Sequence, residues 1–330
     1  MAESKEGVWS NMVRSKKLTG VLLLTALAFL VLLPRFVSGY EVRVITNIFM
    51  YAVIAQGINL MSGYMGYLPF GNAMFFGTGA YITAIGMNKG LSFFLAAPLA
   101  ALVAILFSVV FGFVLLRLRG HYFSIATIGL SAALLGVVQN STITGGAMGT
   151  TLPLLTLSPS ATNAFFYFGM LALMVFSSLV LYLVVKSRFG FGIRSIKANE
   201  EAAVSMGINT TYHKVVTWAI SALFTSLAGA LYAYWMSFIA PAEVFDIMIG
   251  VDCIVIMLLG GTGTILGPIA GAFVYEFVAQ SVWSALPNYH LGVLGILIIV
   301  ILLFVPKGIF SGIGDFARRR QMKLLRKAGT

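Results

Sequence analysis

Long blocks without any charged side chain are the feature that most restricts what this chain can fold into. Asp, Glu, Lys and Arg are absent from residues 44–88, 91–116, 121–185, 215–242, 253–275 and 277–306. A helix that spans a bilayer needs about 20 apolar residues, so several of these blocks are long enough for more than one span. Only 9% of the 330 residues are charged, against about 25% in an ordinary soluble domain. Transmembrane β-barrels would show alternating segments of about ten residues, and this sequence has none. The sequence therefore predicts an all-α, polytopic transmembrane helix bundle.

Charges, glycines and prolines between the apolar runs divide the chain into ten predicted spans. The spans cover residues 18–36, 44–62, 67–88, 91–116, 121–139, 162–185, 213–236, 247–260, 264–285 and 291–306. The eighth is short, and we expect it to be tilted or broken. The prediction is one transmembrane domain over residues 1–330, with a polar N-terminal segment at 1–17, a polar loop at 186–212 and a basic tail at 307–330.

The positions of the cations predict the orientation of the bundle. With the N-terminus in the cytoplasm, 18 of the 21 Lys and Arg residues fall on the inner side, and only Arg35, Arg43 and Lys89 fall outside. Cytoplasmic loops of membrane proteins carry such an excess of positive charge. Both termini and the 186–212 loop are therefore expected in the cytoplasm. The net charge of +11 then follows from topology, and no nucleic acid partner is expected.

The polar stretch 188–208 is the longest between two membrane-type blocks, and its pattern predicts a short helix. Asn199 can cap a helix by accepting a hydrogen bond from a free backbone N–H. Two carboxylates then fall in the first turn, where the helix dipole favours negative charge, and a glycine can end the helix about two turns later. Either this is a surface loop with one helical turn, or a soluble partner grips it as a docking helix. The residues concerned are Asn199, Glu200, Glu201, Ala202, Ala203, Met206 and Gly207.

Three glycine-rich passages interrupt the apolar sequence at residues 63–79, 145–149 and 260–271. Small residues let membrane helices approach closely. Broken helices at membrane depth occur where they face protein or a water-filled path. Tight helix packing and the lining of a substrate path are therefore both open interpretations.

Ionisable side chains within the predicted spans are few. Asp252 and Glu276 are the two carboxylates placed inside spans, and such groups are functional candidates because burial in lipid is costly. Each could equally be a hydrogen-bond partner within the bundle, and the same alternative applies to uncharged polar groups. The candidate pathway or gating residues are Gln56, Asn59, Asn72, Gly145, Gly146, Asp252 and Glu276.

Several kinds of site are not expected. The sequence has no Gly-x-x-x-x-Gly-Lys-Ser/Thr phosphate loop, its three histidines form no ligand pattern, and Cys253 is its single cysteine. We therefore expect no metal, no cofactor and no catalytic constellation. A proton-driven carrier would need a membrane-embedded relay, for which two scattered acids are a weak case, whereas an importer powered by a separate ATPase needs none.

Motifs over most of the chain resemble one known family. They are GYMGYLPFGNAMFFGTGAY (63–81), GHYFSIATIGL (120–130), TGGAMGT (144–150), SRFGFGIRSIKANEEAAVSMGIN (187–209), SALFTSLAGALYAYWMSFIAP (221–241) and LLGGTGTILGPIAGAF (258–273). In this order they resemble the permease subunits of ATP-binding-cassette importers for branched-chain amino acids, most closely the LivM type. The family's EAA-x-x-x-Gly coupling segment is matched by Glu201, Ala202, Ala203 and Gly207.

The resemblance implies a function and a set of partners. The chain would be a non-catalytic permease that forms half of a translocation path in the bacterial inner membrane. Its partners would be a second homologous permease, two cytoplasmic ATPase subunits that hydrolyse ATP, a periplasmic or lipid-anchored solute-binding protein, and the membrane lipid. The family usually has Gly-His-Ala at 71–73 and Gly-Gly-Pro-Asn-Gly at 145–149, where this chain departs. Related permeases import urea or other small amides, so the cargo stays open between these classes. An ion-coupled carrier or channel is the remaining alternative.

Overall fold

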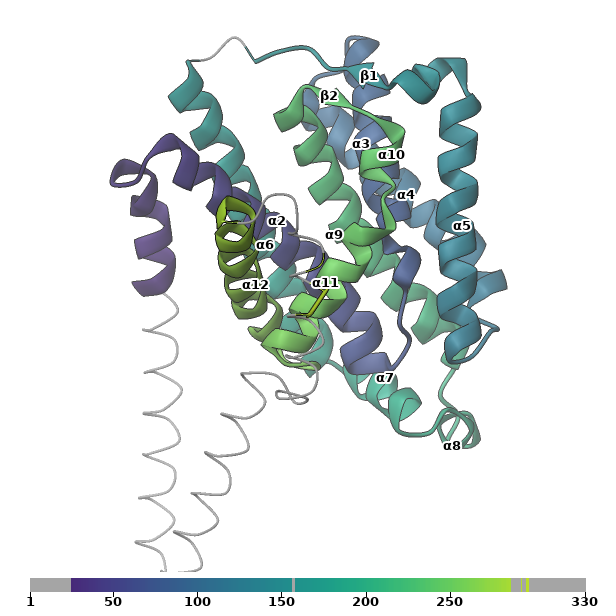
Figure 1. Ribbon diagram of the computed structural model, residues 1–330. Coiled ribbons are helices and arrows are strands. Elements are labelled where there is room, and N and C mark those ends of the chain that lie inside the picture. The colour runs from purple at the N-terminus through teal and green to yellow at the C-terminus, as the bar shows by residue number, and fades with distance from the viewer. Residues whose placement is uncertain (1–24, 156–157, 286–291, 293–294, 297–330) are drawn as a thin grey trace, which may run out of the picture.

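The fold is a bundle of α-helices, as predicted (Figure 1). The structure is a computed structural model that describes residues 25–155, 158–285, 292 and 295–296. The predicted segments 1–17 and 307–330 lie outside the described residues. In the residues that the structure describes, β-structure is limited to β1 (Thr150–Thr151) and β2 (Phe238–Ile239), which pair antiparallel.

Five helices in the described part of the chain are long and apolar enough to cross a membrane. The first is α2 (Gly39–Asn59), which continues without interruption into a π-helical segment, η2 (Leu60–Met65). The others are α4 (Phe93–Leu115), α5 (His121–Asn140), α6 (Pro159–Lys186) and α9 (Thr210–Met236). Each coincides closely with a predicted span.

The remaining predicted spans correspond to shorter helices or lie outside the described residues. Predicted spans three, eight and nine match α3 (Ala73–Asn88), α11 (Ile247–Gly260) and α12 (Gly267–Ala285). The first span is described as a helix over Thr25–Arg35 whose end is the 3₁₀ turn η1 (Leu33–Arg35). The tenth is described only at residues 292 and 295–296. Short connecting helices are η3 (Phe70–Asn72), η4 (Thr142–Thr144), η5 (Gly146–Met148) and α10 (Pro241–Val244).

The third span begins later than predicted, because its first residues are not part of the long helix. Pro69 lacks a backbone N–H, and Gly71 has non-helical backbone angles, so α3 starts only at residue 73. Helix α5 satisfies the freed backbone groups: Ser124 Oγ donates to Leu68 O at 2.8 Å, and Gly71 N donates to Thr127 Oγ1 at 3.2 Å. Irregular backbone is tolerated here because protein covers it.

Helix α9 packs against both α3 and α4, which also contact each other. Its contact with α3 depends on two glycines. A Cβ added to Gly79 would lie 2.0 Å from Ser226 O, and one added to Gly229 would lie 2.1 Å from Phe76 O. Similar close contacts join α11 and α12, where a Cβ on Gly271 would lie 2.0 Å from Ile256 O. In the first and third glycine-rich passages the glycines therefore serve tight helix packing.

The two ends of the bundle carry different structures. Helices α7 (Arg188–Ala198) and α8 (Glu200–Ser205) lie at one end, and β1, β2 and α10 lie at the other (Figure 1). We call the end with α7 and α8 the inner end, because it carries the loop predicted to be cytoplasmic. A separate hydrophobic cluster, which includes Trp218, Phe75, Phe123 and Ile193, fills the core near this end.

Candidate functional site

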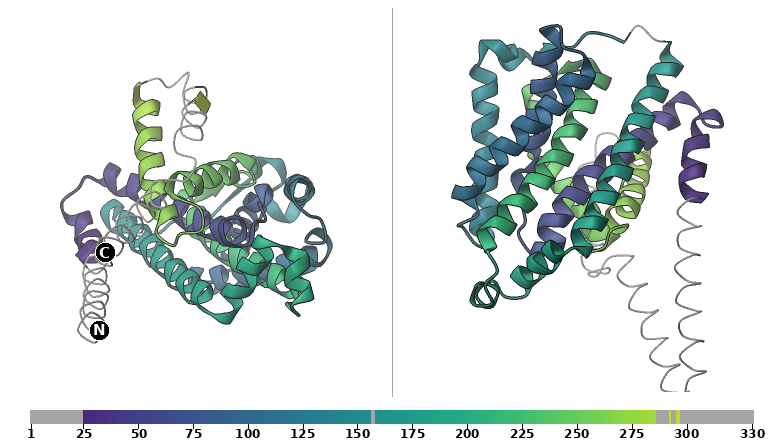
Figure 2. Two further views of the ribbon diagram at one scale, coloured as in Figure 1. Left: turned by 90° about the horizontal axis from the view of Figure 1, so that it is seen from below. Right: turned by 180° about the vertical axis from the view of Figure 1, so that it is seen from behind.

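The polar loop 186–212 contains two helices where the sequence predicted one. The predicted docking helix is α8, and the 11-residue α7 precedes it. Figure 2 shows, from behind, α6 leading down into α7 and then into α8 at the tip of the bundle. Helix α7 was missed because it contains two glycines, Gly190 and Gly192, which disfavour a helix. The detectable signal was Ser187, whose side chain accepts from Gly190 N, followed by Ile193 and Ile196 at helical spacing, both buried.

Helix α8 has the predicted cap and the predicted end. Asn199 Oδ1 accepts a hydrogen bond from Ala202 N at 3.0 Å. The helix stops before Gly207, whose φ of +82° is accessible to glycine at little cost. Gly207 N donates to Val204 O at 2.9 Å and Ile208 N donates to Ala203 O at 3.0 Å, which closes the last turn.

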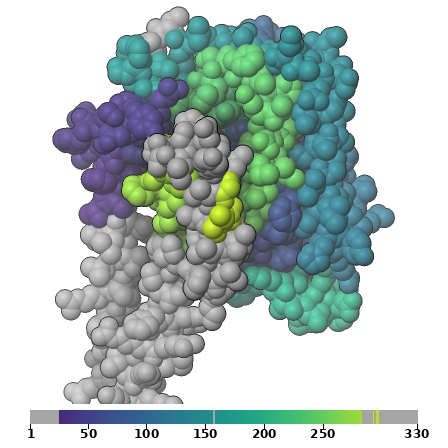
Figure 3. All heavy atoms as spheres, viewed as in Figure 1, coloured from purple at the N-terminus to yellow at the C-terminus, as the bar shows by residue number. Residues whose placement is uncertain are grey.

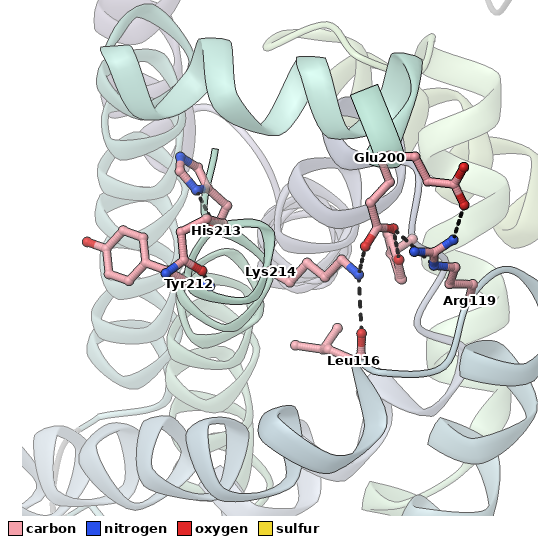
Figure 4. A network of polar contacts seen from close by, with 9 residues as sticks. Leu116, Arg119, Glu200, Tyr212, His213 and Lys214 are labelled. Atoms are coloured by element: carbon pink, nitrogen blue, oxygen red, sulfur yellow. Dashed lines mark hydrogen bonds and ion pairs between the residues drawn. The ribbon is translucent and has the colours of Figure 1, made fainter. Parts of the chain in front are cut away.

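The two carboxylates of α8 have different surroundings. The Glu201 side chain is 79% exposed, but that of Glu200 is only 15% exposed and turns towards the bundle. Lys214 Nζ donates to Glu200 Oε1 at 2.5 Å (Figure 4). Tyr67 Oη donates to Glu200 Oε2 at 2.6 Å. Lys214 Nζ also donates to Leu116 O at 3.3 Å. Glu200 therefore joins α8 to α9, to the end of α4 and to the loop before α3.

Arg119 adds a more exposed arm to this network. Its Nη1 donates to Glu201 Oε1 at 3.0 Å, and its Nε lies 3.8 Å from Glu200 Oε2. Its hydrogen bond to Glu201, together with the nearby Glu200 charge, raises the pKa of Arg119. Arg119 lies in the link between α4 and α5, so the exposed carboxylate of α8 is joined to the inner ends of these two spans.

The protonation state of Glu200 follows from the balance of burial and partners. Burial alone would raise the pKa of this carboxyl. The hydrogen bonds from Lys214 and Tyr67 and the positive charges of Lys214 and Arg119 outweigh that effect, so the pKa is lowered from its ordinary value of 4.5. Glu200 is therefore ionised at neutral pH, and its charge holds the network together.

Sequence reasoning did not identify the partners of Glu200. Lys214 is only 4% exposed, and a cation so well buried is normally paired. The sequence feature that could have identified Lys214 is its position directly before the long uncharged block 215–242. Tyr67 and Arg119 had no comparable signal, because their contacts with α8 join residues more than 80 positions apart.

One side of α8 packs on the bundle and the other is free among the described residues. Ala203 is fully buried in the inner hydrophobic cluster. Ala202 is exposed, and so are Val204 at 54% and Met206 at 69%. Of the predicted docking residues, Ala203 thus faces the bundle, whereas Ala202 and Met206 lie on the exposed side. A short helix with exposed apolar side chains next to an exposed carboxylate can bind a soluble protein surface.

Helix α7 is also attached to the spans. Lys197 Nζ donates to Gly63 O at 2.5 Å, and Arg194 donates to Val185 O. On α9, the His213 ring stacks on Phe189 with 4.7 Å between ring centroids. Helices α7 and α8 therefore form one unit whose side chains hold the inner ends of several spans.

The three uncharged polar side chains predicted for a path lie in contacts between helices, and each is fully buried. Gln56 on α2 bonds Ser177 and Ser178 of α6, with Nε2 donating to Ser178 Oγ at 2.7 Å. Asn72 Nδ2 donates to Thr225 Oγ1 of α9 at 2.8 Å. Asn59 joins α2 to the loop between α11 and α12. These contacts correspond to the packing alternative, and a role in a path stays a prediction.

The other candidates are placed at two different sites. Gly145 and Gly146, with φ of +83° and +64°, line a hollow of about 450 Å³ at the end opposite α8, together with Gln139, Asn140, Ser141 and Thr142. Tyr275 Oη donates to Asp252 Oδ1 at 2.6 Å, and Gln280 Nε2 donates to Glu276 Oε1 at 3.2 Å. No group of three or more His, Cys, Asp or Glu in the described part of the chain could hold a metal ion.

Comparisons with known proteins match this chain to transport permeases. Residues 40–302 match the family described as the permease component of branched-chain amino acid transport systems. The chain is 29% identical to the high-affinity branched-chain amino acid transport permease LivM of Salmonella typhimurium, over 94% of this chain and 77% of that protein. Identity to the LivM protein of Escherichia coli is 28% with the same coverage. The autoinducer 2 import permease LsrC of Yersinia pestis is 28% identical over 59% of this chain and 57% of its own length. No solved structure matches the chain.

Proposed function

Because this chain belongs to the family of permease components of branched-chain amino acid transport systems, we propose that α8 is the helix through which separate ATPase subunits drive it. The chain is a multi-pass permease of an ATP-binding-cassette importer in the bacterial inner membrane. In the proposal, the cytoplasmic ATPases bind the exposed side of α8, and their closure on ATP displaces α7 and α8 together.

The observation that carries this proposal is the two-sided character of α8. Glu201, Val204 and Met206 are exposed on one side. On the other side Glu200 is held by Lys214, Tyr67 and Arg119, and Ala203 is buried. A force on the exposed side is transmitted to the inner ends of α4, α5 and α9 through charge-assisted hydrogen bonds, which are stronger than neutral ones.

The cargo we propose is a branched-chain, hydrophobic amino acid. The similarity to the LivM proteins extends over 94% of this chain, whereas that to the autoinducer 2 permease extends over 59%. The remaining partners are those of the family: a second homologous permease and a solute-binding protein on the other side of the membrane. Urea or a small amide is the second candidate cargo, because this chain departs from the usual family residues at 71–73 and 145–149.

Uptake by the complete transporter in vesicles tests the docking role. Gly207→Arg combines backbone strain at φ +82° with a bulky charge beside α8, where nothing lies within 4 Å. Gly90→Arg is a matched control, because Gly90 has φ +89°, equally open surroundings and a place at the opposite end. We expect Gly207→Arg to abolish ATP-dependent uptake and the response of ATP hydrolysis to cargo, while Gly90→Arg leaves both.

Three further measurements separate the alternatives. Val204→Glu changes only the exposed side of α8 and should reproduce the loss seen with Gly207→Arg. Competition of labelled leucine uptake by valine, isoleucine and urea identifies the cargo class. Uptake by this chain alone, without ATPase subunits, would contradict the proposal and favour an ion-coupled carrier. Normal uptake by both α8 variants would contradict it as well.

A further inference from the structure

The inner end of α2 is π-helical over six residues, Leu60–Met65. Such segments make up well under about 1% of residues in proteins and occur frequently at functional sites. This one ends at Gly66 in the left-handed conformation, with Gly66 N donating to Ser62 O and Tyr67 N donating to Met61 O. All six residues except Ser62 are buried. A rare helix geometry is therefore enclosed by protein at the inner end.

Helices α7 and α8 hold this segment from one side. Lys197 Nζ of α7 donates to Gly63 O at 2.5 Å, inside the π-helical turn. The stem of Lys197 packs on Gly66, where an added Cβ would lie 3.3 Å from Lys197 Cγ. The next residue, Tyr67, donates to Glu200 of α8. The segment and its cap are thus attached directly to the unit that the proposed ATPase contact would move.

The loop between α11 and α12 also contacts the segment. Asn59 is the last residue before the π-helical turn and is fully buried. Its Oδ1 accepts from Gly263 N at 2.8 Å, and its Nδ2 donates to Thr264 O at 2.8 Å. A Cβ added to Gly63 would lie 2.0 Å from Asn59 Oδ1 and 2.6 Å from Gly263 N. Gly63 is therefore in contact with both the incoming lysine and the loop.

We propose that the π-helical segment is a joint that transmits the movement of α7 and α8 to α11 and α12, with Lys197 and Asn59 as its positioning residues. This inference rests on the proposed function of α8. When α7 and α8 move, Lys197 pulls on Gly63 O. Asn59 then transmits the displacement to the loop that leads into α12 at Gly267. Asn59 acts through its contacts with the loop backbone and need not touch the cargo.

A π-helical turn is suited to such a joint because it contains one residue more per hydrogen-bonded ring than an α-helical turn. Conversion of the turn to α-helix displaces the flanking chain by about 1.5 Å, the rise of one residue. Elements with two discrete arrangements convert small shifts at one site into larger rearrangements at another.

The test uses the complete transporter in vesicles and measures cargo molecules imported per ATP hydrolysed. Lys197→Met keeps the stem of the side chain and removes the amine, and Asn59→Leu removes both hydrogen bonds at similar size. We expect each to lower imported cargo per ATP about fivefold or more, the usual range of coupling between sites. The double variant should be no worse than the stronger single variant, because both residues lie on one route.

The control removes a comparable contact elsewhere on the same helix. Ser177→Ala with Ser178→Ala deletes the two hydrogen bonds that Gln56 makes to α6, one turn from Asn59. This variant should leave cargo per ATP unchanged even if it lowers the amount of assembled transporter. A purely structural role for Asn59 predicts parallel losses of hydrolysis and import, with the ratio unchanged, and that result would overturn the proposal.

Hydrogen exchange in the same transporter gives a second readout, which does not need the Asn59→Leu variant. Exchange at the amides of residues 60–67 should differ between the nucleotide-free and ATP-bound states, and Lys197→Met should remove the difference. If the α8 variants stop import while Lys197→Met leaves both the ratio and the exchange pattern unaltered, the joint is refuted and the docking role stands. If the α8 variants also have no effect, the docking role itself fails.

Discussion

At the residue scale, two neighbouring glutamates, Glu200 and Glu201, have different surroundings and different contacts. Glu200 and Glu201 look equivalent in the sequence, since both fall in the first turn of a capped helix. The structure turns Glu200 towards the buried Lys214 and leaves Glu201 exposed. The difference arises from where α8 sits on the bundle, and a local pattern does not contain that information.

The ion pair of Lys214 and Glu200 should contribute measurably to stability. Lys214→Met leaves the Glu200 carboxylate without its main partner, and breaking a buried pair costs about 3–5 kcal/mol when both groups are fully buried. Because Glu200 keeps some contact with water, we expect a loss of about 2 kcal/mol. Thermal unfolding of the purified chain in detergent measures this. Glu200→Gln in the same background should recover part of the loss, and Arg119→Ala should leave the melting temperature unchanged.

The lowered pKa of Glu200 predicts a pH dependence. A carboxyl whose pKa is lower in the folded state stabilises the fold above its unfolded pKa, and this contribution is lost as the pH falls through the folded pKa. The melting temperatures of the wild-type protein and Glu200→Gln should therefore differ by a constant amount near pH 7. The difference should shrink only as the pH falls below the ordinary glutamate value of 4.5. A difference that already shrinks between pH 8 and pH 6 would contradict this assignment.

At the element scale, features with local causes were predictable from the sequence. The apolar runs gave the long helices α4, α5, α6 and α9 to within a few residues. Asn199 and Gly207 marked the start and the end of α8. The third span was predicted to begin at residue 67, and the break at Pro69 and Gly71, which hydrogen bonds with α5 support, lies inside it. The partners of Glu200, the π-helical turn and the placement of Asn59 were not predictable, because each depends on contacts between segments distant in the chain.

The cap of α8 gives a prediction confined to this element. Asn199→Ala removes the hydrogen bond to Ala202 N, and loss of such a cap costs about 1 kcal/mol. The first turn of α8 should fray, so amide exchange should accelerate at residues 202–205 while the melting temperature of the bundle stays nearly constant. Asn209→Ala, which removes the equivalent cap of α9, should instead affect a helix held along its length by packing and produce no such local fraying. Equal exchange at residues 202–205 in wild type and Asn199→Ala would count against the cap.

The close approach of α3 and α9 makes one glycine nearly irreplaceable. In Gly229→Ala the new methyl group would lie 2.1 Å from Phe76 O, so one helix must move away from the other. Overpacking of this kind costs about 1–3 kcal/mol or more. Gly129→Ala is the matched control on α5, because nothing lies within 4 Å of its added Cβ and alanine favours a helix by up to about 1 kcal/mol. The melting temperature of the isolated chain should fall for Gly229→Ala and stay the same or rise for Gly129→Ala.

At the scale of the whole molecule, α5 stands out as an edge with little cover. It forms one side of the described bundle (Figures 1 and 3). In the most apolar stretch of α5, 22% of the residues are buried, against 67% in that of α9. The exposed side of α5 combines the small residues Gly129, Ala132 and Ala133 with three bulky ones, Tyr122, Ile125 and Val137. The exposed side of α4 carries bulky apolar side chains along its length, such as Phe94, Leu102 and Val110. Lipid accepts bulky apolar groups, and small residues favour a helix neighbour.

This contrast predicts which side of the chain the proposed second permease contacts. One end of α5 adjoins Arg119 of the α8 network and the other end adjoins the hollow lined by Gly145 and Gly146. A partner packed on α5 would therefore enclose a route between the two ends. Gly129→Trp fills the open space beside α5 and should abolish co-purification of the second permease, while the isolated chain keeps its melting temperature. Val110→Trp adds the same side chain to the exposed side of α4 and should leave assembly intact. If Val110→Trp breaks the complex and Gly129→Trp does not, the partner sits on α4 and the edge formed by α5 faces lipid.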